Sequence, residues 1–201
     1  MNYDFIEVGT SDFETHIQNA TDDHVGLSIE PIQYYLDRLP NKKNVKKLSC
    51  AVSFDGIAGR DKVYYVPHET IVRHGLPHWI RGCNSIGDYH YQHKIQNLQE
   101  FVETIDIDMI PLGDILEQHN VEQLKTLKLD TEGGDSYILQ SFVPVLENRQ
   151  RDWWPQTIEF ETNILTPEEV VNETIDMYVN LGYRVYHRGV GEQNTILAID
   201  I

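Results

Sequence analysis

Acidic residues stand at the ends of several short apolar runs in this 201-residue sequence. Glu30 follows Gly9 by 21 positions, the spacing at which an acidic residue after a second strand can accept hydrogen bonds from both hydroxyls of a ribose. This spacing predicts a ligand that contains a nucleoside. The alternative interpretation is an exposed carboxylate that caps the helix beginning after Pro31.

The loop that follows the first apolar run, residues 9–14, contains a single glycine. A dinucleotide-binding fold would show G-x-G-x-x-G, whose glycines let the backbone approach a pyrophosphate. A short-chain dehydrogenase would also need a tyrosine four residues before a lysine, and none of the tyrosines is so placed. NAD is therefore the weaker candidate. S-adenosylmethionine (SAM) has no phosphate and carries a sulfonium cation, which is compatible with an acidic loop.

Methyl transfer from SAM to a hydroxyl requires a base, because a neutral alcohol is a poor nucleophile until its proton is removed. Asp130 ends an apolar run and is the first candidate to accept that proton. His90 is the second candidate, with His93 as its alternative. The competing interpretations are an N-cap for Asp130 and a solvated loop position for either histidine.

Metal binding is a weaker possibility. Asp130 with Glu159 or Glu161 would offer the hard oxygen ligands that Mg²⁺ prefers, although carboxylates at strand ends are also common without metal. Two histidine pairs have spacings that could place both rings on one helical face, but no third zinc ligand is indicated: His74 with His78, and His90 with His93. We therefore predict no zinc site.

Aromatic residues are frequent in and around residues 54–99. Flat rings stack on the apolar faces of pyranoses, so this composition favours a carbohydrate acceptor, although packing beneath an insertion is an equally good interpretation of any one ring. The candidate rim comprises Tyr64, Tyr65, Trp79, Tyr89, Tyr91, Trp153 and Trp154. As acceptor-binding residues we predict Glu132, Glu159, Trp79, Tyr89 and His93.

Strand and helix patterns alternate along the chain. We expect strands at 5–9, 25–29, 45–53, 101–107, 124–130, 157–161, 183–187 and 195–199, and helices at 13–20, 32–38, 112–120, 136–146 and 166–181. These predict one α/β domain over residues 1–201: a Rossmann-like, mostly parallel sheet of about seven strands with helices on both faces and a C-terminal antiparallel hairpin. Residues 54–99 read as an insertion with a hairpin near 62–66.

The net charge and the number of cysteines limit the binding partners and the cellular compartment that we expect for this protein. Asp and Glu number 32 against 16 Lys and Arg, and a net charge of −16 repels nucleic acid and anionic membrane surfaces. The two cysteines are too few for a disulfide framework, and no apolar run reaches the roughly 18 residues typical of a membrane span. We therefore expect a cytoplasmic protein.

Taken together, these segments resemble the FkbM-type methyltransferase family. The resemblance spans nearly the whole chain and rests on six stretches: Phe5-Ile6-Glu7-Val8-Gly9, Ser28-Ile29-Glu30-Pro31, Ala51-Val52-Ser53, the segment from Leu76-Pro77-His78-Trp79-Ile80-Arg81-Gly82 to Ser85-Ile86, Lys128-Leu129-Asp130-Thr131-Glu132-Gly133-Gly134-Asp135 and Ile158-Glu159. In that family Asp-x-Glu-Gly follows the fourth strand and Glu-Pro follows the second. The resemblance implies a SAM-binding fold and O-methylation of hydroxyls on sugars and related metabolites.

The resemblance also implies roles for individual residues. Gly9 and Ser11 would lie against the amino-acid tail of SAM, Glu30 would bind the ribose and Ser53 would sit near the adenine. Asn84 and Ser85 would reach the tail from the insertion, or form a polar turn. Glu7 keeps the carboxylate of the family's first-loop Asp, and Asp130 would border the cofactor.

The first loop departs from the family pattern because it lacks a second glycine. This departure leaves an alternative function open: a catalytically silent module with the SAM-binding fold, which binds a glycan or stabilises a larger enzyme. The first strand begins within five residues of Met1, so the chain also reads as a module of a longer, glycan-modifying protein.

Overall fold

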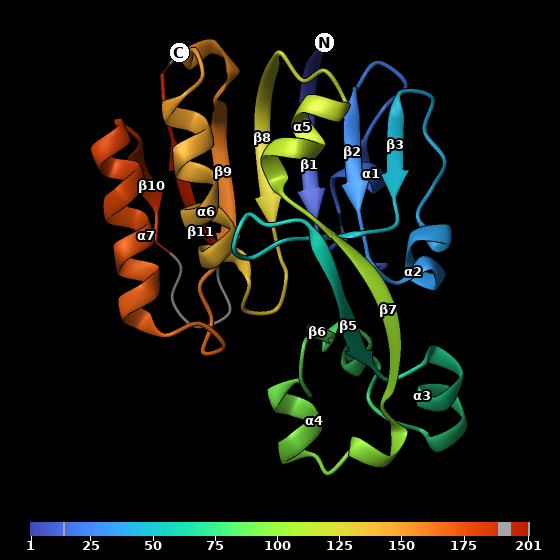
Figure 1. Cartoon of the computed structure of the whole chain (residues 1–201). Coiled ribbons are helices and arrows are strands. Elements are labelled where there is room, and N and C mark those ends of the chain that lie inside the picture. Colours follow the sequence, from blue (N-terminus) through green and yellow to red (C-terminus); the bar gives the residue numbers. More distant parts are fainter. Residues whose placement is uncertain (14, 189–193, 201) are drawn as a thin grey trace.

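The main sheet of the protein has seven strands. The computed structural model describes residues 1–13, 15–188 and 194–200, and orders the strands β10-β11-β9-β8-β1-β2-β3 (Figure 1). Their bounds are β1 (Asn2–Val8), β2 (Gly26–Ile29), β3 (Val45–Leu48), β8 (Gln123–Leu129), β9 (Pro155–Glu161), β10 (Arg184–His187) and β11 (Asn194–Ala198). Neighbouring strands among β3, β2, β1, β8 and β9 pair in parallel, whereas β11 pairs antiparallel with both β9 and β10. The predicted mostly parallel sheet with a C-terminal hairpin is confirmed.

Helices cover both faces of this sheet because alternate side chains of a strand point to opposite sides. Ile6 of β1 packs in the main core with α5 (Leu112–Gln118), α6 (Asp135–Glu147) and α7 (Glu168–Leu181), which lie in front of the sheet in Figure 1. Its neighbour Phe5 packs instead with Ile17 of α1 (His16–Asn19) and Leu36 of α2 (Gln33–Arg38).

A second, smaller sheet forms an insertion lobe, here defined as residues 51–110. Its strand order is β4-β7-β5-β6, and in Figure 1 the lobe projects below the carboxyl ends of the main strands. Its elements are β4 (Ala51–Val52), β5 (Gly59–Tyr65), α3 (His68–His74), the 3₁₀ helix η1 (His78–Gly82), β6 (Ser85–Ile86), α4 (Tyr91–Ile95), the 3₁₀ helix η2 (Gln99–Phe101) and β7 (Glu103–Ile110). A further 3₁₀ helix, η3 (Arg151–Trp153), precedes β9.

Two expectations about this region were wrong. The apolar run 45–53 is not one strand: β3 ends at Leu48 in the main sheet, and Ala51 pairs with Met109 of β7 in the second sheet. The hairpin near 62–66 is not formed either, because β5 pairs along its length with the distant β7 and at Val63 and Tyr64 with β6. The return strand β7 therefore belongs to the same sheet as β5, so the lobe extends beyond residue 99.

None of the helices in the described part of the chain is long and apolar enough to cross a membrane.

Gly26 sets the packing between β1 and β2. It pairs directly with Phe5, and a Cβ atom there would lie 2.4 Å from Cζ of the Phe5 ring. That ring is 3% exposed and stacks on His16 with 5.4 Å between centroids, so it has little room to move.

We predict that Gly26→Ala lowers the free energy of unfolding by about 1–3 kcal/mol, because overpacking forces the Phe5 ring out of place. The control is Gly59→Ala, where an added Cβ meets no atom within 4 Å. Thermal and urea unfolding of both variants measures the difference. Equal melting temperatures for the two variants would show that Phe5 moves at no cost.

Candidate functional site

A cavity opens at the carboxyl ends of β1, β2 and β8. Strand order reverses at β1, whose neighbours are β2 on one side and β8 on the other, and open α/β sheets bind ligands at such a point. About 610 Å³ within the cavity and its open mouth is free of protein atoms. Its lining comes from the strand ends and from the insertion lobe: Val8, Gly9, Ser11, Phe13, Glu30, Pro31, Ala51, Val52, Phe54, Val63, Gly82, Asn84, Ser85, Ile86, Asp130, Thr131 and Glu132.

Gly9 is required where β1 ends. Its φ of +78° favours glycine, and a Cβ atom would lie 1.8 Å from the carbonyl oxygen of Asp130. Two residues further on, Ser11 also adopts a left-handed conformation, with φ of +45°. Its backbone N–H donates to Oε2 of Glu30 at 2.7 Å, and this charge-assisted bond offsets the strain of a non-glycine residue in that region. The first loop thus turns without its second glycine.

Glu30 is the most constrained carboxylate of the cavity. Its side chain is 3% exposed, Oε2 accepts from the backbone N–H of Ser11, and Oε1 accepts from that of Ile32 at 2.9 Å. Burial raises the pKa of Glu30 to about 7, and the two backbone donors oppose this shift. A carboxylate held in this way presents its remaining lone pairs to the cavity.

Glu7 does not line the cavity, although it was expected to contact the cofactor. It lies beneath the first loop, where its carboxylate accepts hydrogen bonds from the backbone N–H groups of His16 (2.6 Å) and Ile17 (3.1 Å) and from Oγ of Ser28 (2.5 Å). Burial raises its pKa. These contacts hold the start of α1 against the sheet, so Glu7 supports the loop from below.

The predicted adenine contact Ser53 also points away from the cavity. Its Oγ donates to Oδ1 of Asp55 at 2.7 Å and accepts from the backbone N–H of Ile57 at 3.0 Å. Its neighbours Val52 and Phe54 line the cavity instead. Phe54 was not predicted from the sequence, because an apolar run does not show which of its side chains face a cavity. The other predicted cofactor residues, Gly9, Ser11, Glu30, Asn84, Ser85 and Asp130, all line the cavity.

Two polar atoms of the lining are buried without a hydrogen-bond partner in the described part of the chain: Oγ of Ser11 and Oδ1 of Asn84. The amide nitrogen of Asn84 donates to the carbonyl oxygen of Arg81 at 2.9 Å, which fixes the orientation of the side chain. Because buried polar groups are normally paired, these two atoms are suited to a polar ligand.

Four carboxyl groups gather where β8 and β9 end. Asp135 is 1% exposed and accepts from the backbone N–H groups of Thr131 and Glu161, both at 2.8 Å, so it ties the two strand ends together. Burial and mutual repulsion raise the pKa values of Glu132 and Glu161 to about 8 and that of Asp135 to about 6. Burial also raises the pKa of Asp130, against the opposing charge of Lys128.

The residues that the structure describes contain no group of three His, Cys, Asp or Glu side chains arranged to hold a metal ion. The possible Mg²⁺ ligands at Asp130, Glu159 and Glu161 therefore gain no support. Glu159 does not line the cavity, and its Oε1 accepts from the side-chain amide of Asn194 at 2.7 Å.

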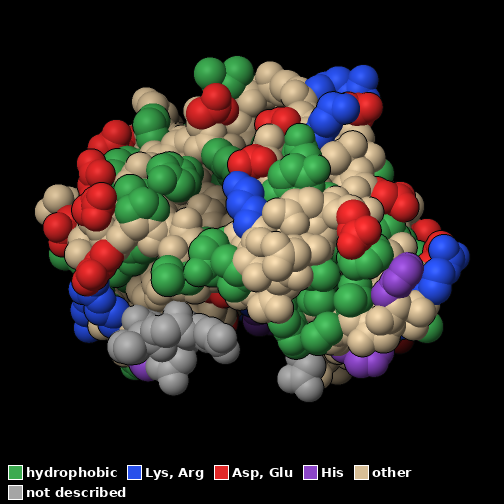
Figure 2. Space-filling view, turned by 90° about the horizontal axis from the view of Figure 1, so that it is seen from below, with side chains coloured by type: hydrophobic (Ala, Val, Ile, Leu, Met, Phe, Trp, Pro, Cys, Tyr) green, Lys and Arg blue, Asp and Glu red, His purple; other side chains and the backbone are tan. Residues whose placement is uncertain are grey.

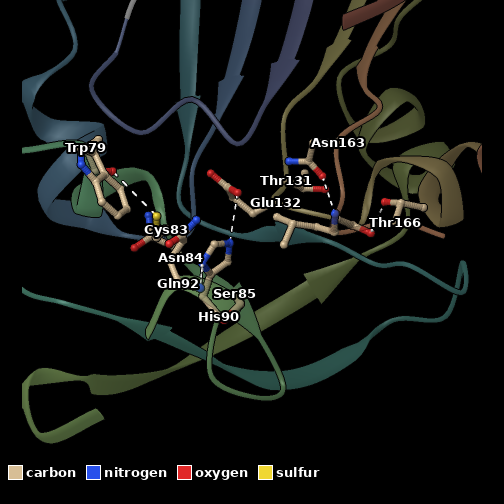
Figure 3. Close-up of polar contacts among 12 residues, drawn as sticks. Trp79, Cys83, Asn84, Ser85, His90, Gln92, Thr131, Glu132, Asn163 and Thr166 are labelled. Atoms are coloured by element: carbon tan, nitrogen blue, oxygen red, sulfur yellow. Dashed lines mark hydrogen bonds and ion pairs between the residues drawn. The ribbon is translucent and has the colours of Figure 1, made fainter. Parts of the chain in front are cut away.

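His90 contacts the cavity indirectly. Its Nε2 lies 3.2 Å from Oε2 of Glu132, and its Nδ1 accepts from the backbone N–H of Gln92 at the start of α4 (Figure 3). The second bond requires an unprotonated Nδ1, so Nε2 carries the hydrogen and the ring is neutral. Burial lowers the pKa of His90 to about 4. With its only lone pair engaged, His90 is a poorer candidate base than Asp130.

The remaining predicted acceptor residues lie around the cavity at different distances from it. Glu132 lines it, whereas His93 is fully buried within the lobe. Trp79 and Tyr89 are exposed on the lobe and do not line the cavity, and Figure 3 shows Trp79 separated from Glu132 by Cys83.

Trp153 and Trp154 do not belong to any rim of the cavity. They precede Pro155 at the start of β9, the end of the sheet opposite to the cavity. Trp154 is buried, its Nε1 donates to the carbonyl oxygen of Leu146, and its ring stacks on Tyr183. Both rings pack in the core because their indoles cover the starts of β8 and β9.

The buried carboxyls predict an unusual dependence of stability on pH. Glu30, Glu132 and Glu161 have pKa values of about 7, 8 and 8, above their ordinary 4.5, so the folded protein binds more protons than the unfolded chain up to pH 8. His90 and His93 have the opposite effect, because their pKa values fall from 6.5 to about 4, but this effect ends near pH 6.5.

We therefore predict that the ligand-free protein loses about 1–3 kcal/mol of unfolding free energy between pH 6.5 and pH 8. Urea unfolding at the two pH values measures this loss, and Glu132→Gln should reduce it. A protein that is equally stable at both values would show that water solvates these carboxyls well.

Residues 6–185 match the family model described as the methyltransferase FkbM domain. Comparison with curated proteins and with solved structures finds no match. The matched range contains every strand end that shapes the cavity, including Gly9, Glu30 and Asp130. Because the match extends over most of the 201 residues, it agrees with the resemblance noted from the sequence. The chain belongs to the FkbM methyltransferase domain family.

Proposed function

We propose that this protein is a SAM-dependent O-methyltransferase with a Rossmann-like fold, and that it transfers a methyl group to a hydroxyl of a sugar or glycan. Membership of a methyltransferase family implies a SAM-type cofactor in general. The observation that carries the assignment to this cavity is Glu30, a buried carboxylate at the end of β2 whose two oxygens are fixed by backbone donors. This is the position from which an acidic residue can accept both ribose hydroxyls.

The lining also suits the rest of the cofactor. Val52, Phe54 and Ile86 supply an apolar wall for the adenine. Oγ of Ser11 and Oδ1 of Asn84 have no hydrogen-bond partner within residues 1–13, 15–188 and 194–200, and they can pair with the carboxylate and ammonium of an amino-acid tail. The first loop has a glycine at position 9, where the backbone approaches the carbonyl oxygen of Asp130. The further glycines of a phosphate-binding loop are not needed, because SAM has no phosphate.

When bound, SAM supplies an activated methyl group, so the protein has to position the acceptor and take its proton. We assign the role of general base to Asp130, because it lines the cavity and its side chain is partly exposed to solvent. Lys128 lies 3.6 Å from its carboxylate and favours the ionised form. A raised pKa strengthens a carboxylate as a base.

The groups in and near the cavity favour a hydroxyl-rich acceptor. Glu132 lines the cavity and offers a carboxylate to sugar hydroxyls, whereas Glu159 lies outside it and accepts from Asn194. Trp79 and Tyr89 offer exposed rings on the neighbouring lobe. A neutral polyol suits these groups better than a phosphorylated acceptor, which the carboxylates would repel. The cytoplasmic location remains a prediction.

We predict that Glu30→Gln weakens SAM binding by about 1–3 kcal/mol, because the neutral amide forms weaker hydrogen bonds with the ribose and disrupts the bond to Ser11. Calorimetric titration with SAM measures the loss. The matched control is Glu147→Gln, an exposed position on α6 remote from the cavity. If both variants bind SAM like the wild type, Glu30 does not contact the ribose.

We further predict that, at saturating SAM, Asp130→Asn forms S-adenosylhomocysteine (SAH) at least about 100-fold more slowly than the wild type, because the general base is lost. The assay measures SAH formation from SAM with a panel of methyl hexopyranosides. If the wild type binds SAM but methylates none of these acceptors, the result favours the alternative of a silent glycan-binding module.

A further inference from the structure

The cavity is lined by acidic side chains without a basic partner among the lining residues. Glu30, Asp130 and Glu132 contribute three carboxyl groups, and none of the described residues that line the cavity is Lys, Arg or His. Glu30 is engaged by two backbone N–H groups at the end of β2. The charges of Asp130 and Glu132 are less well compensated and lie together at the end of β8.

The nearest cations are already paired with other carboxylates. Nε of Arg81 lies 2.9 Å from Oδ1 of Asp12, which also contacts Arg38 at 2.6 Å through Oδ2. The guanidinium carbon of Arg81 lies 4.4 Å from the centre of the Phe13 ring, which lines the cavity. The positive charge of Arg81 is compensated by Asp12. Lys128 faces Asp130 across 3.6 Å, a distance at which it only partly compensates that carboxylate.

Glu132 has no cationic partner among the residues that the structure describes. The group that holds it is His90, whose ring is neutral because Nδ1 accepts the N–H of Gln92. Figure 3 shows the His90 ring directed at the Glu132 carboxyl, so the contact orients Glu132 without cancelling its charge.

The other groups around Glu132 add to the negative charge. Burial and then the charges of Asp130 and Asp135 raise the pKa of Glu132, and burial and the charge of Glu132 raise that of Glu161. The nearby Cys83 thiol has its own pKa raised to about 12 by burial, so it stays neutral. Glu132 also adopts φ of +56°, a backbone conformation rarely taken by residues other than glycine.

We propose that Asp130 and Glu132 make this cavity selective for the positively charged cofactor SAM over its neutral product SAH. This inference rests on the proposed function of the cavity. The two ligands share the adenosine and the amino-acid tail and differ only in the methyl group and positive charge on sulfur. A cavity whose carboxyls lack a counter-ion is stabilised by the sulfonium and loses that stabilisation once the methyl group has left. Release of the product is thereby favoured.

Calorimetric titration with three ligands tests this selectivity. SAM carries the sulfonium, SAH is neutral at sulfur, and sinefungin carries an amine in place of the methylsulfonium, which separates charge from the methyl group. At pH 8 and about 0.15 M salt, where the field of distant surface charges is screened, we expect SAM and sinefungin to bind at least about tenfold more tightly than SAH.

Two isosteric variants locate the source of the selectivity. Glu132→Gln and Asp130→Asn should each weaken SAM and sinefungin by about tenfold while changing SAH by less than about threefold. Either variant suffices if the other does not fold, as judged by circular dichroism. Glu147→Gln, which removes one charge from the far end of α6, should leave all three affinities unchanged.

The outcomes separate the two proposals. If all three ligands bind the wild type with equal affinity, or if the variants weaken SAH as much as SAM, charge selectivity is refuted while SAM remains the cofactor. If none of the three ligands binds, the cofactor assignment itself fails.

Discussion

The backbone of the first loop meets the backbone after β8 at a distance that only glycine permits. A Cβ atom at Gly9 would lie 1.8 Å from the carbonyl oxygen of Asp130, and this contact occurs where β1 lies between β2 and β8. It brings the ends of three strands into one small region, so that Glu30, Asp130 and the first loop line a single cavity. A side chain at position 9 would separate these strand ends and open the site.

The insertion lobe completes the cavity from the other side. In Figure 1 it lies below the carboxyl ends of the main strands, and it contributes Gly82, Asn84 and Ile86 to the lining. Arg81 links it to the first loop through Asp12. Figure 2, seen from below, shows acidic and basic side chains spread over the lobe and the main body rather than gathered in one basic patch. The wall is therefore held by a few specific ion pairs and by packing.

The carboxyl groups at the ends of β8 and β9 lower the free energy of unfolding when they are ionised. Asp135 is buried and Glu132 and Glu161 are partly buried, and their raised pKa values mean that ionisation is unfavourable without a counter-ion. Asp135 is held because it joins the ends of β8 and β9 through backbone hydrogen bonds. A cationic ligand would compensate this charge, so the feature that weakens the free protein at high pH is suited to bind a sulfonium.

The sequence alone determined the order of the strands and helices of the main sheet, the terminal hairpin and the positions of Gly9, Glu30 and Asp130. These follow from local periodicity and from the fixed spacing between the ends of consecutive parallel strands, which a one-dimensional pattern records. Most of the cofactor-binding residues that the family resemblance implied line the cavity.

Only the tertiary structure decided where individual side chains point and which partners they take. An apolar run does not reveal that β3 ends at Leu48 and that Ala51 joins another sheet, because strand pairing with β7 is a long-range event. Ser53 turns to Asp55, leaving Phe54 to face the cavity, and Glu7 binds the start of α1. His90 is neutral and contacts Glu132 through Nε2, because its Nδ1 accepts a hydrogen bond from the N–H of Gln92. This bond to Gln92 depends on where α4 packs.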